Sequence, residues 1–320
     1  MKTIRLAYAD MWPDYNPESF ELIKLLNKKY NIVSDCEKPD FVLCGPFGHD
    51  FLKYDCPRIL YLGEAIAPDF NLYDYAIGFD KITFGDRYLR VPIYFFDSKS
   101  LKLAKIKHTY SDEFYLEKRK FCNFIVSNGS GICEREEVFK KLSSRKKVDS
   151  AGRYLNNMPD GKSCSNKLEF QRDYKFSLAF ENSIMDGYIT EKIVDAWAAG
   201  TVPIYYGGNG IDEEFNPNAF IDITKFSSID ECIDYILFLD KNPDEYIKLA
   251  RAPIYAEGKS EKFEEEILNF FEKIFDDSKA GLKRYKRNSK LTMWGGNYEK
   301  RINESYLSTK ERIKRRILSK

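Results

Sequence analysis

Two series of short apolar segments, each interrupted by segments with helical spacing, constrain the fold of this 320-residue chain most strongly. In the first series, runs rich in β-branched and aromatic residues lie at 4–8, 41–44, 58–62, 75–79 and 89–94. Phe20, Ile23 and Leu26 follow helical spacing between the first two runs. Because strands that alternate with helices favour crossover connections, the pattern predicts a parallel sheet covered by helices.

A second series of the same kind begins at residue 121. We expect its strands at 121–127, 176–180 and 202–206, and its helices at 134–142, 191–199, 229–239, 244–250 and 261–274. The length of the chain fits two domains of roughly 150 residues each. We therefore predict two successive α/β lobes that join near 110–121, with a ligand in the cleft between them.

The formal net charge of +1 conceals a strongly basic C-terminal segment. Residues 280–320 contain 13 Lys and Arg against 3 Asp and Glu. The preceding residues contain 38 Lys and Arg against 47 Asp and Glu. Ile313 and Ile317 fall on one side of a predicted amphipathic helix in this segment. Such a tail fits an anionic membrane surface, near which each basic residue contributes about 1 kcal/mol. The alternative is a charged tail that is only solvated.

Several kinds of site lack the residues that they need. The chain has two His and seven Cys, with no Cys-x-x-Cys and no Asp-x-Asp pair. We therefore expect no histidine-built metal site, no His-dependent triad and no disulfide framework, and we assign no metal ligands. The scattered cysteines are typical of reduced thiols in a cytoplasm. The short first apolar run, which Asp10 interrupts, predicts no signal peptide, and no run reaches the roughly 18 apolar residues of a membrane span.

The densest group of chemistry-bearing residues lies at 174–208, which reads as strand, polar loop, helix and strand. Thr190 is a predicted N-cap, and the helix start beyond it presents free N–H groups and a positive dipole end to an anion. Tyr188 adds a hydroxyl and Lys192 a positive charge, so the loop has the groups to hold a diphosphate without a metal. The alternative is a well-capped helix whose Glu191 and Lys192 are merely solvated.

This segment closely resembles the signature of the α-1,3/4-fucosyltransferases, glycosyltransferase family 10. The resemblance rests on Phe180-Glu181-Asn182, on Tyr188-Ile189-Thr190-Glu191-Lys192 and on the proline-containing strand at 202–206. It implies an α/β fold of the GT-B class, in which two Rossmann-like lobes face each other across the active site. It also implies inverting transfer of L-fucose from GDP-fucose to a sugar hydroxyl.

The resemblance also implies roles for individual residues. Tyr188 and Lys192 would contact the diphosphate, and Glu191 would lie near the fucose ring as a catalytic carboxylate. Glu181 and Asn182 would line the same donor site.

A second match comprises Ser127-Asn128 and Arg135, whose family counterpart binds the donor phosphates. A guanidinium suits that role because its planar fork grips phosphate oxygens bidentately. The alternative for Arg135 is an ordinary surface ion pair with a neighbouring glutamate.

A third match, at 60–92, is similar to the bacterial members of the family. It contains Glu64, which follows a strand at a glycine turn and is our candidate for the base that deprotonates the acceptor hydroxyl. The alternative for Glu64 is a solvent-facing loop carboxylate. Asp10, Asp69 and Asp74 are rival carboxylates in the same lobe.

The resemblance divides the chain into an acceptor-binding lobe (1–115), a GDP-fucose-binding lobe (116–278) and a basic amphipathic tail (279–320). It implies a β-galactoside acceptor that contains GlcNAc, fucosylated on the GlcNAc 3-hydroxyl to give Lewis x-type glycans of lipopolysaccharide. No cofactor is strictly required, with stimulation by Mn²⁺ left open, as is the oligomeric state. We expect a bacterial, cytoplasmic enzyme that binds the inner face of the membrane peripherally.

Two other functions fit parts of the sequence. A GT-B enzyme that uses another nucleotide sugar or linkage would keep the scaffold at 174–208 and change the sugar pocket. A non-enzymatic protein that binds membranes or nucleic acid would use the basic tail. The acidic body and the lack of a recognisable reading module argue against a nucleic-acid partner.

Overall fold

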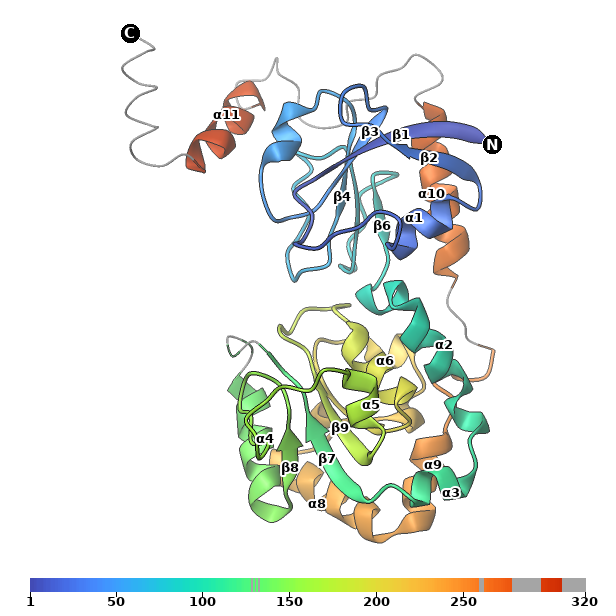
Figure 1. The fold of residues 1–320 in the computed structure, drawn as a ribbon, viewed down its shortest axis with the longest axis vertical. Coiled ribbons are helices and arrows are strands. Elements are labelled where there is room, and N and C mark those ends of the chain that lie inside the picture. Colours follow the sequence, from blue (N-terminus) through green and yellow to red (C-terminus); the bar gives the residue numbers. More distant parts are fainter. Residues whose placement is uncertain (128, 130, 132, 259–261, 278–294, 307–320) are drawn as a thin grey trace. The chain divides into compact units, whose positions relative to one another are not determined.

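The computed structural model describes residues 1–127, 129, 131, 133–258, 262–277 and 295–306. It divides into two compact units, one formed by Met1–Val91 with Lys262–Lys320 and the other by Pro92–Glu261. Each unit contains one parallel sheet with helices around it (Figure 1). The predicted α/β fold with two parallel sheets is confirmed.

The first unit contains a six-stranded sheet in the order β2-β1-β3-β4-β5-β6, with every neighbouring pair parallel. Its strands are β1 (Lys2–Ala9), β2 (Tyr30–Ser34), β3 (Phe41–Cys44), β4 (Arg58–Tyr61), β5 (Tyr75–Gly78) and β6 (Tyr88–Arg90). The chain passes from β1 to one side and from β3 onward to the other, so the topological switch point lies between β1 and β3. Ligands of open α/β sheets bind at the carboxyl ends of the strands that flank such a point.

In the first unit, two strand assignments differ from the sequence predictions. The edge strand β2 was not predicted, because most of its side chains are exposed and its apolar signal is short. The strand expected at 89–94 ends at Arg90 and is followed by a short 3₁₀ helix, Ile93–Phe96. Pro92 lies between them and has no N–H to donate to a neighbouring strand.

The helices of the first unit come from both ends of the chain: α1 (Glu21–Leu26), α10 (Phe263–Asp277) and α11 (Gly295–Ser305). Helix α10 packs on the sheet through Phe275, whose ring centroid lies 5.0 Å from those of Tyr30 and Phe41. The segment expected to close the second lobe therefore belongs to the first unit. The sequence pattern indicates that this helix has an apolar face, but it does not indicate which of the two sheets that face packs against.

Helix α11 lies within the predicted basic tail and packs on the first unit. Tyr298 and Ile302 cover a buried cluster of that unit, and the Tyr298 hydroxyl donates a hydrogen bond to Asp69. The buried Arg58 guanidinium donates to the Glu299 carboxylate at 2.9 Å. This part of the tail is therefore a structural element, whereas 279–294 and 307–320 lie outside the described residues.

The second unit contains a five-stranded parallel sheet in the order β11-β10-β9-β7-β8. Its strands are β7 (Lys120–Phe124), β8 (Val148–Ser150), β9 (Tyr174–Phe180), β10 (Val202–Tyr206) and β11 (Ile221–Asp222). Its helices are α2 (Ser98–Ile106), α3 (Asp112–Leu116), α4 (Cys133–Arg145), α5 (Lys167–Gln171), α6 (Glu191–Ala198), α7 (Ile211–Glu214), α8 (Ile229–Lys241) and α9 (Pro243–Arg251). In this unit the switch point lies between β7 and β9.

The chain enters the second unit after Val91, well before the junction expected near 110–121. Lys107 helps to explain this, because its buried ammonium donates hydrogen bonds of 2.7 Å to the carbonyls of Ala250 and Ala252. Burial lowers the pKa of Lys107 to about 7. These bonds fix the segment after α2 to the end of α9, deep within the second unit.

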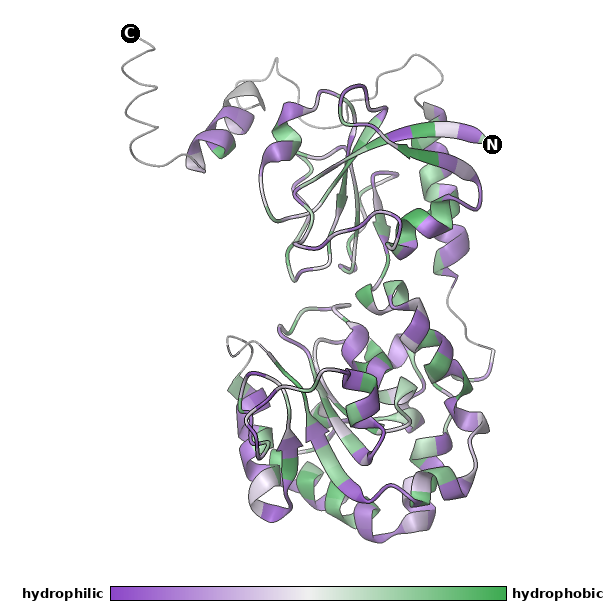
Figure 2. Cartoon of the chain, in the orientation of Figure 1, coloured by the Kyte–Doolittle hydropathy of each residue, from purple (hydrophilic) through white to green (hydrophobic). Residues whose placement is uncertain are grey.

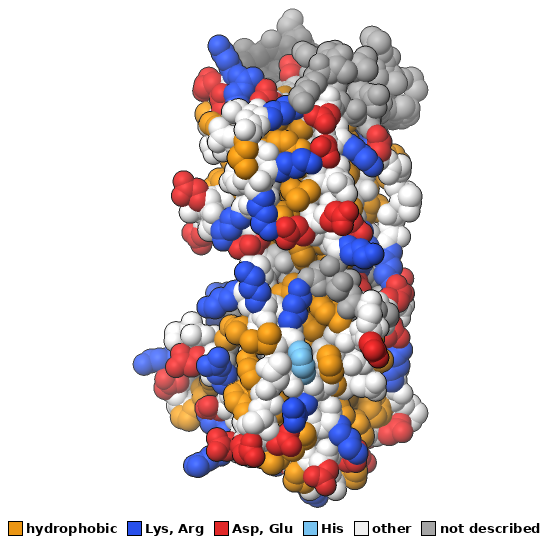
Figure 3. All heavy atoms as spheres, turned by 90° about the vertical axis from the view of Figure 1, so that its right-hand side faces the viewer, with side chains coloured by type: hydrophobic (Ala, Val, Ile, Leu, Met, Phe, Trp, Pro, Cys, Tyr) orange, Lys and Arg blue, Asp and Glu red, His pale blue; other side chains and the backbone are white. Residues whose placement is uncertain are grey.

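Apolar residues follow the strands through the middle of each unit, and hydrophilic residues lie on the outer faces of the helices (Figure 2). On the face shown in Figure 3, Lys and Arg side chains are interspersed with Asp and Glu over both units. In the part of the chain that the structure describes, no helix is both long enough and apolar enough to cross a bilayer.

We predict that Glu299→Ala weakens the attachment of α11 by about 1–2 kcal/mol, because it leaves the buried Arg58 without its carboxylate partner. Hydrogen–deuterium exchange of Gly295–Ser305 should then accelerate by about 5–30-fold. Glu304→Ala is the matched control, since Glu304 lies on the same helix and its side chain is 44% exposed. Equal exchange in the two variants would contradict this role of Glu299.

Candidate functional site

The switch point of the second unit brings together three loops that follow β7, β9 and β10. The loop after β9 contains most of the predicted site residues, and the loop after β7 leads into α4, which contains Arg135. Polar side chains at the carboxyl ends of parallel strands meet at one edge of the sheet. This edge is where the structure gathers Glu181, Asn182, Arg135, Thr190 and Lys192.

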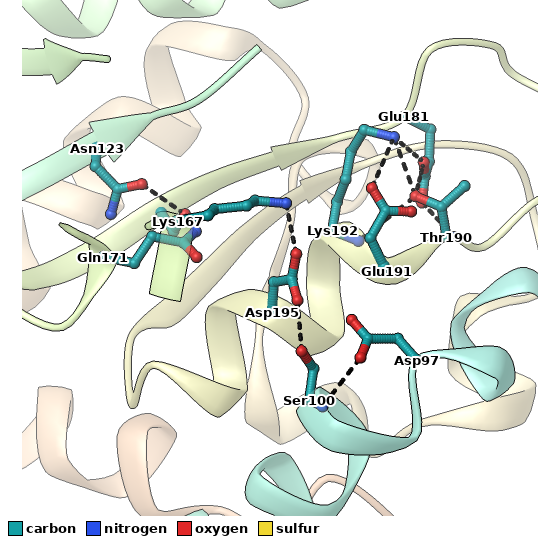
Figure 4. Close-up of polar contacts among 11 residues, drawn as sticks. Asp97, Ser100, Asn123, Lys167, Gln171, Glu181, Thr190, Glu191, Lys192 and Asp195 are labelled. Atoms are coloured by element: carbon teal, nitrogen blue, oxygen red, sulfur yellow. Dashed lines mark hydrogen bonds and ion pairs between the residues drawn. The ribbon is translucent and has the colours of Figure 1, made fainter. Parts of the chain in front are cut away.

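Glu181 is the buried centre of this group (Figure 4). Its carboxylate accepts hydrogen bonds from the Thr190 N–H at 2.8 Å, from the Thr190 hydroxyl at 2.7 Å and from the Lys192 ammonium at 3.2 Å. Burial raises the pKa of Glu181, and Lys192 opposes that shift. Glu181 therefore holds the start of α6 and orients the lysine.

Thr190 caps α6, as the sequence predicts. Its hydroxyl accepts from the Lys192 N–H and, at 3.1 Å, from the Lys192 ammonium. Glu181 and Thr190 therefore orient the Lys192 ammonium. Lys192 lies in the first turn of α6, where the helix dipole favours an anion. Lys192 is 16% exposed, so its charge remains accessible at the surface of the unit.

Glu191 is the first residue of α6, and its side chain is 41% exposed. Although desolvation acts in the opposite direction, Lys192 and Lys167 hold the pKa of Glu191 below its ordinary value. The group is therefore a carboxylate at neutral pH, able to stabilise positive charge beside it.

Arg135 lies in the first turn of α4 and is buried. It donates a hydrogen bond of 3.1 Å to the Asn182 side-chain oxygen, and its guanidinium carbon is 5.8 Å from the centre of the Tyr154 ring. A Cβ at Gly131 would come within 2.5 Å of the guanidinium, so a larger residue there would displace the end of the Arg135 side chain. The solvated surface ion pair considered for Arg135 is excluded by this burial. Asn128, part of the same sequence match, lies outside the described residues.

Tyr188 is buried at the end of the loop that follows β9. The loop turns at Gly187, whose φ of 79° favours glycine. It also approaches the loop after β10 closely, because a Cβ at Gly208 would lie 1.8 Å from the Met185 carbonyl oxygen. The glycines of the signature therefore bring the two loops into contact.

A polar chain that the sequence analysis did not identify anchors α6 from the side. The Asp195 carboxylate forms an ion pair of 2.5 Å with Lys167 and accepts a hydrogen bond of 2.7 Å from the Ser100 hydroxyl (Figure 4). Asp195 lies one helical turn after Glu191, so the two share a face of α6. Helices α2 and α5 are thereby tied to the helix that carries the candidate site. No local pattern indicates these contacts, because the residues lie about 30 and 95 positions apart in the chain.

In the first unit, Glu64 is exposed in the loop that follows β4, at the carboxyl edge of the sheet. Its three rivals have structural roles. Asp10 accepts from the N–H groups of Asp50 and Phe51, and Asp74 is buried and accepts from the Arg58 N–H. Asp69 accepts from Asn71 and from the Tyr298 hydroxyl in the same unit. Glu64 is thus the most accessible of these carboxylates.

Within the described residues, no group of three or more His, Cys, Asp or Glu side chains is placed to hold a metal ion. The groups suited to an anion at the second switch point are instead Arg135, Lys192 and the N–H groups that begin α6.

Two family models match the chain: the fucosyltransferase C-terminal domain of glycosyltransferase family 10 at residues 115–254, and the N-terminal domain of α-(1,3)-fucosyltransferase FucT at residues 6–97. The chain is 33% identical to α-(1,3)-fucosyltransferase FucT of Helicobacter pylori, over 86% of this chain and 66% of that protein. It is 25% identical to a putative fucosyltransferase, R654, of Acanthamoeba polyphaga mimivirus, over 82% of this chain and 45% of that one. The chain thus spans less than two thirds of the length of these relatives.

Solved structures agree with these matches. A crystal structure of α1,3-fucosyltransferase with GDP-fucose aligns with a TM-score of 0.76 and 28% identity, covering 90% of this chain and 94% of the other. A second crystal structure of α1,3-fucosyltransferase, with GDP, aligns with a TM-score of 0.73 and 30% identity, covering 86% of this chain and 91% of the other. The chain belongs to the fucosyltransferases of glycosyltransferase family 10.

Proposed function

We propose that this protein transfers L-fucose from GDP-fucose, with inversion, to the 3-hydroxyl of GlcNAc in an N-acetyllactosamine-type acceptor. The observation that carries the proposal is the group of anion-binding residues at the switch point of the second unit, in a chain that aligns with an α1,3-fucosyltransferase solved with GDP-fucose. Lewis x-type glycans of lipopolysaccharide are the proposed products.

The second unit holds the donor in this proposal. Arg135, Lys192 and the N–H groups of α6 neutralise the diphosphate as GDP departs, with Tyr188 and Asn182 in contact with the donor. Glu181 is buried and acts through Lys192 and Thr190, so it is a positioning residue. Because these cations and N–H groups oppose the charge that develops on the leaving group, we expect transfer without a strict metal requirement.

Glu191 and Glu64 carry the chemistry of the sugar. The ionised Glu191 stabilises the oxocarbenium-like charge that develops on the fucose ring. Glu64 takes the proton of the acceptor hydroxyl while its oxygen bonds to the anomeric carbon. The bond from that carbon to the phosphate oxygen breaks, and its electron pair leaves with GDP.

Activity only with a nucleotide sugar other than GDP-fucose would refute the assignment of GDP-fucose as the donor. A GT-B enzyme that uses another nucleotide sugar would keep the scaffold at 174–208, because a cation beside a capped helix start binds any diphosphate. The fucose assignment rests on the family match and not on those groups alone.

We predict that Lys192→Met and Arg135→Met each weaken GDP binding by about 10–100-fold, because each removes a charge-assisted hydrogen bond worth roughly 1.5–3 kcal/mol. Isothermal titration calorimetry with GDP measures the effect. Lys225→Met is the matched control, since this exposed lysine of the same unit pairs with Asp212. Unchanged GDP affinity in both site variants would overturn the phosphate assignment.

We predict that Glu64→Gln lowers kcat by about 10²-fold or more, because general-base catalysis contributes at least that much, while GDP-fucose affinity stays within about twofold. Steady-state transfer kinetics and donor titration separate the two effects. Glu18→Gln provides the control, as another exposed glutamate of the first unit. Normal turnover with impaired donor binding would exclude Glu64 as the base.

We also propose that the protein binds the inner face of the cytoplasmic membrane through its basic tail at 280–320. Support comes from two basic clusters in the sequence on either side of α11, Lys283-Arg284-Tyr285-Lys286-Arg287 and Lys314-Arg315-Arg316.

Vesicles containing phosphatidylglycerol should retain the protein, whereas pure phosphatidylcholine vesicles should not, because the attraction is electrostatic and salt-sensitive. Replacing Lys314, Arg315 and Arg316 by Ser should reduce the bound fraction several-fold in a sedimentation assay, at about 1 kcal/mol per residue. Replacing the exposed Lys140, Lys141 and Lys147 by Ser tests whether total charge alone explains binding. Equal losses in the two variants would contradict a tail-specific contact.

A further inference from the structure

The switch point of the first unit carries an aromatic cluster that the catalytic roles above do not use. Trp12 follows β1, and its ring centroid lies 4.8 Å from that of Tyr15, 5.3 Å from Phe20 and 6.0 Å from Tyr61. The contacts with Tyr15 and Phe20 are edge-to-face, with interplanar angles of 84° and 81°. Neighbouring rings therefore fix the orientation of the Trp12 indole.

Part of Trp12 nevertheless remains accessible. The residue is half-buried, while Phe20 and Tyr61 beneath it are buried. Its indole N–H donates to no partner among the residues that the structure describes. A fixed aromatic surface with a free N–H is a recognition surface for a sugar ring, which offers both C–H groups and hydroxyls.

The backbone around Trp12 is also unusual. Asp10 and Asp14, on either side of it, have φ values of 56° and 65°. Pro13 and Asp14 form the centre of a turn closed by the Tyr15 N–H and the Trp12 carbonyl at 3.2 Å. Backbone held in this sparsely populated region clusters at binding sites. The strained turn keeps Trp12 at the edge of the sheet.

The loop after β3 completes this edge. A Cβ at Gly45 would lie 2.3 Å from the Asp10 carbonyl oxygen, and the Phe47 N–H donates to that oxygen at 3.1 Å. Phe47 itself is 51% exposed. The two loops that flank the switch point are therefore packed together, and both present aromatic side chains.

Glu64 lies at the same edge. Tyr61, the last residue of β4, contacts Trp12 on one side and lies under Gly63, whose Cβ position is 3.6 Å from the Tyr61 ring. Glu64 follows Gly63 directly. The loop that carries the candidate base therefore begins at a residue in contact with Trp12.

We propose that Trp12 is the platform for the acceptor, stacking on the apolar C–H face of its galactose and donating its indole N–H to a hydroxyl. Galactose fits because its axial 4-hydroxyl leaves one continuous C–H face. This inference rests on the proposed function, since it names the part of the acceptor that the first unit recognises.

The test combines kinetics with direct binding on the full chain, using N-acetyllactosamine as the probe. Trp12→Leu keeps an apolar side chain over Phe20 and Tyr61 but removes the ring and the N–H. It should raise the acceptor KM by about tenfold, the factor equivalent to one aromatic contact. Affinity for GDP and acceptor-independent GDP-fucose hydrolysis should be unchanged. Trp12→Phe, which keeps a ring without the N–H, should give an intermediate KM.

Phe238→Leu is the control, because Phe238 is an exposed aromatic on α8 of the other unit. Saturation-transfer NMR should show contact with the galactose protons H3, H4 and H5 in the wild type, and its loss in Trp12→Leu. Transfer that proceeds with an unchanged KM in Trp12→Leu would overturn the platform while leaving the proposed function intact. Galactose contact at Trp12 without any fucose transfer would overturn the proposed function and leave the platform intact. If neither the contact nor the transfer is observed, both proposals are overturned.

Discussion

The buried carboxylate of Glu181 makes the interactions on which the proposed donor site depends. A glutamate without solvent is unfavourable unless its oxygens are satisfied, and here the Thr190 N–H, the Thr190 hydroxyl and the Lys192 ammonium satisfy them. These bonds set where α6 begins and where its first cation lies. Gly207 makes room for the arrangement, since a Cβ there would come within 2.9 Å of the Glu181 side chain.

In the proposed function, the two units use the topological switch points of their sheets for different tasks. In the second unit the switch point between β7 and β9 gathers cations and helix N–H groups, which suit a diphosphate. In the first unit the switch point between β1 and β3 gathers aromatic rings, which suit the apolar face of a neutral sugar, and Glu64 is exposed in the loop that follows β4. The chemistry of each edge follows from the residues on its loops and not from the sheet.

The elements that depend on a few neighbouring residues, such as central strands and a helix cap, were predicted from the sequence. Period and composition located most central strands, and capping chemistry located Thr190 at the start of α6. The signature at 174–208 grouped Glu181, Asn182 and Lys192, and in the structure Glu181 contacts Lys192 while Asn182 contacts Arg135. Each of these features is encoded within a few residues, where propensity and tertiary structure agree.

Contacts between distant segments could not be read in the same way. Nothing local distinguishes an α10 that covers the first sheet from one that covers the second, or a basic tail from a helix held by Arg58 and Tyr298. The contacts of Asp195 with Lys167 and Ser100 were not predicted for the same reason, because each residue alone resembles an ordinary polar side chain. The partners of such residues are determined by the fold.

Transfer of fucose to a defined hydroxyl is the most direct test of the central claim. The purified protein is incubated with GDP-fucose and N-acetyllactosamine, and the product linkage is determined by NMR, with parallel reactions that contain other nucleotide sugars. We expect one α-linked fucose on the 3-hydroxyl of GlcNAc for each GDP released. Transfer from another nucleotide sugar, with none from GDP-fucose, would contradict it.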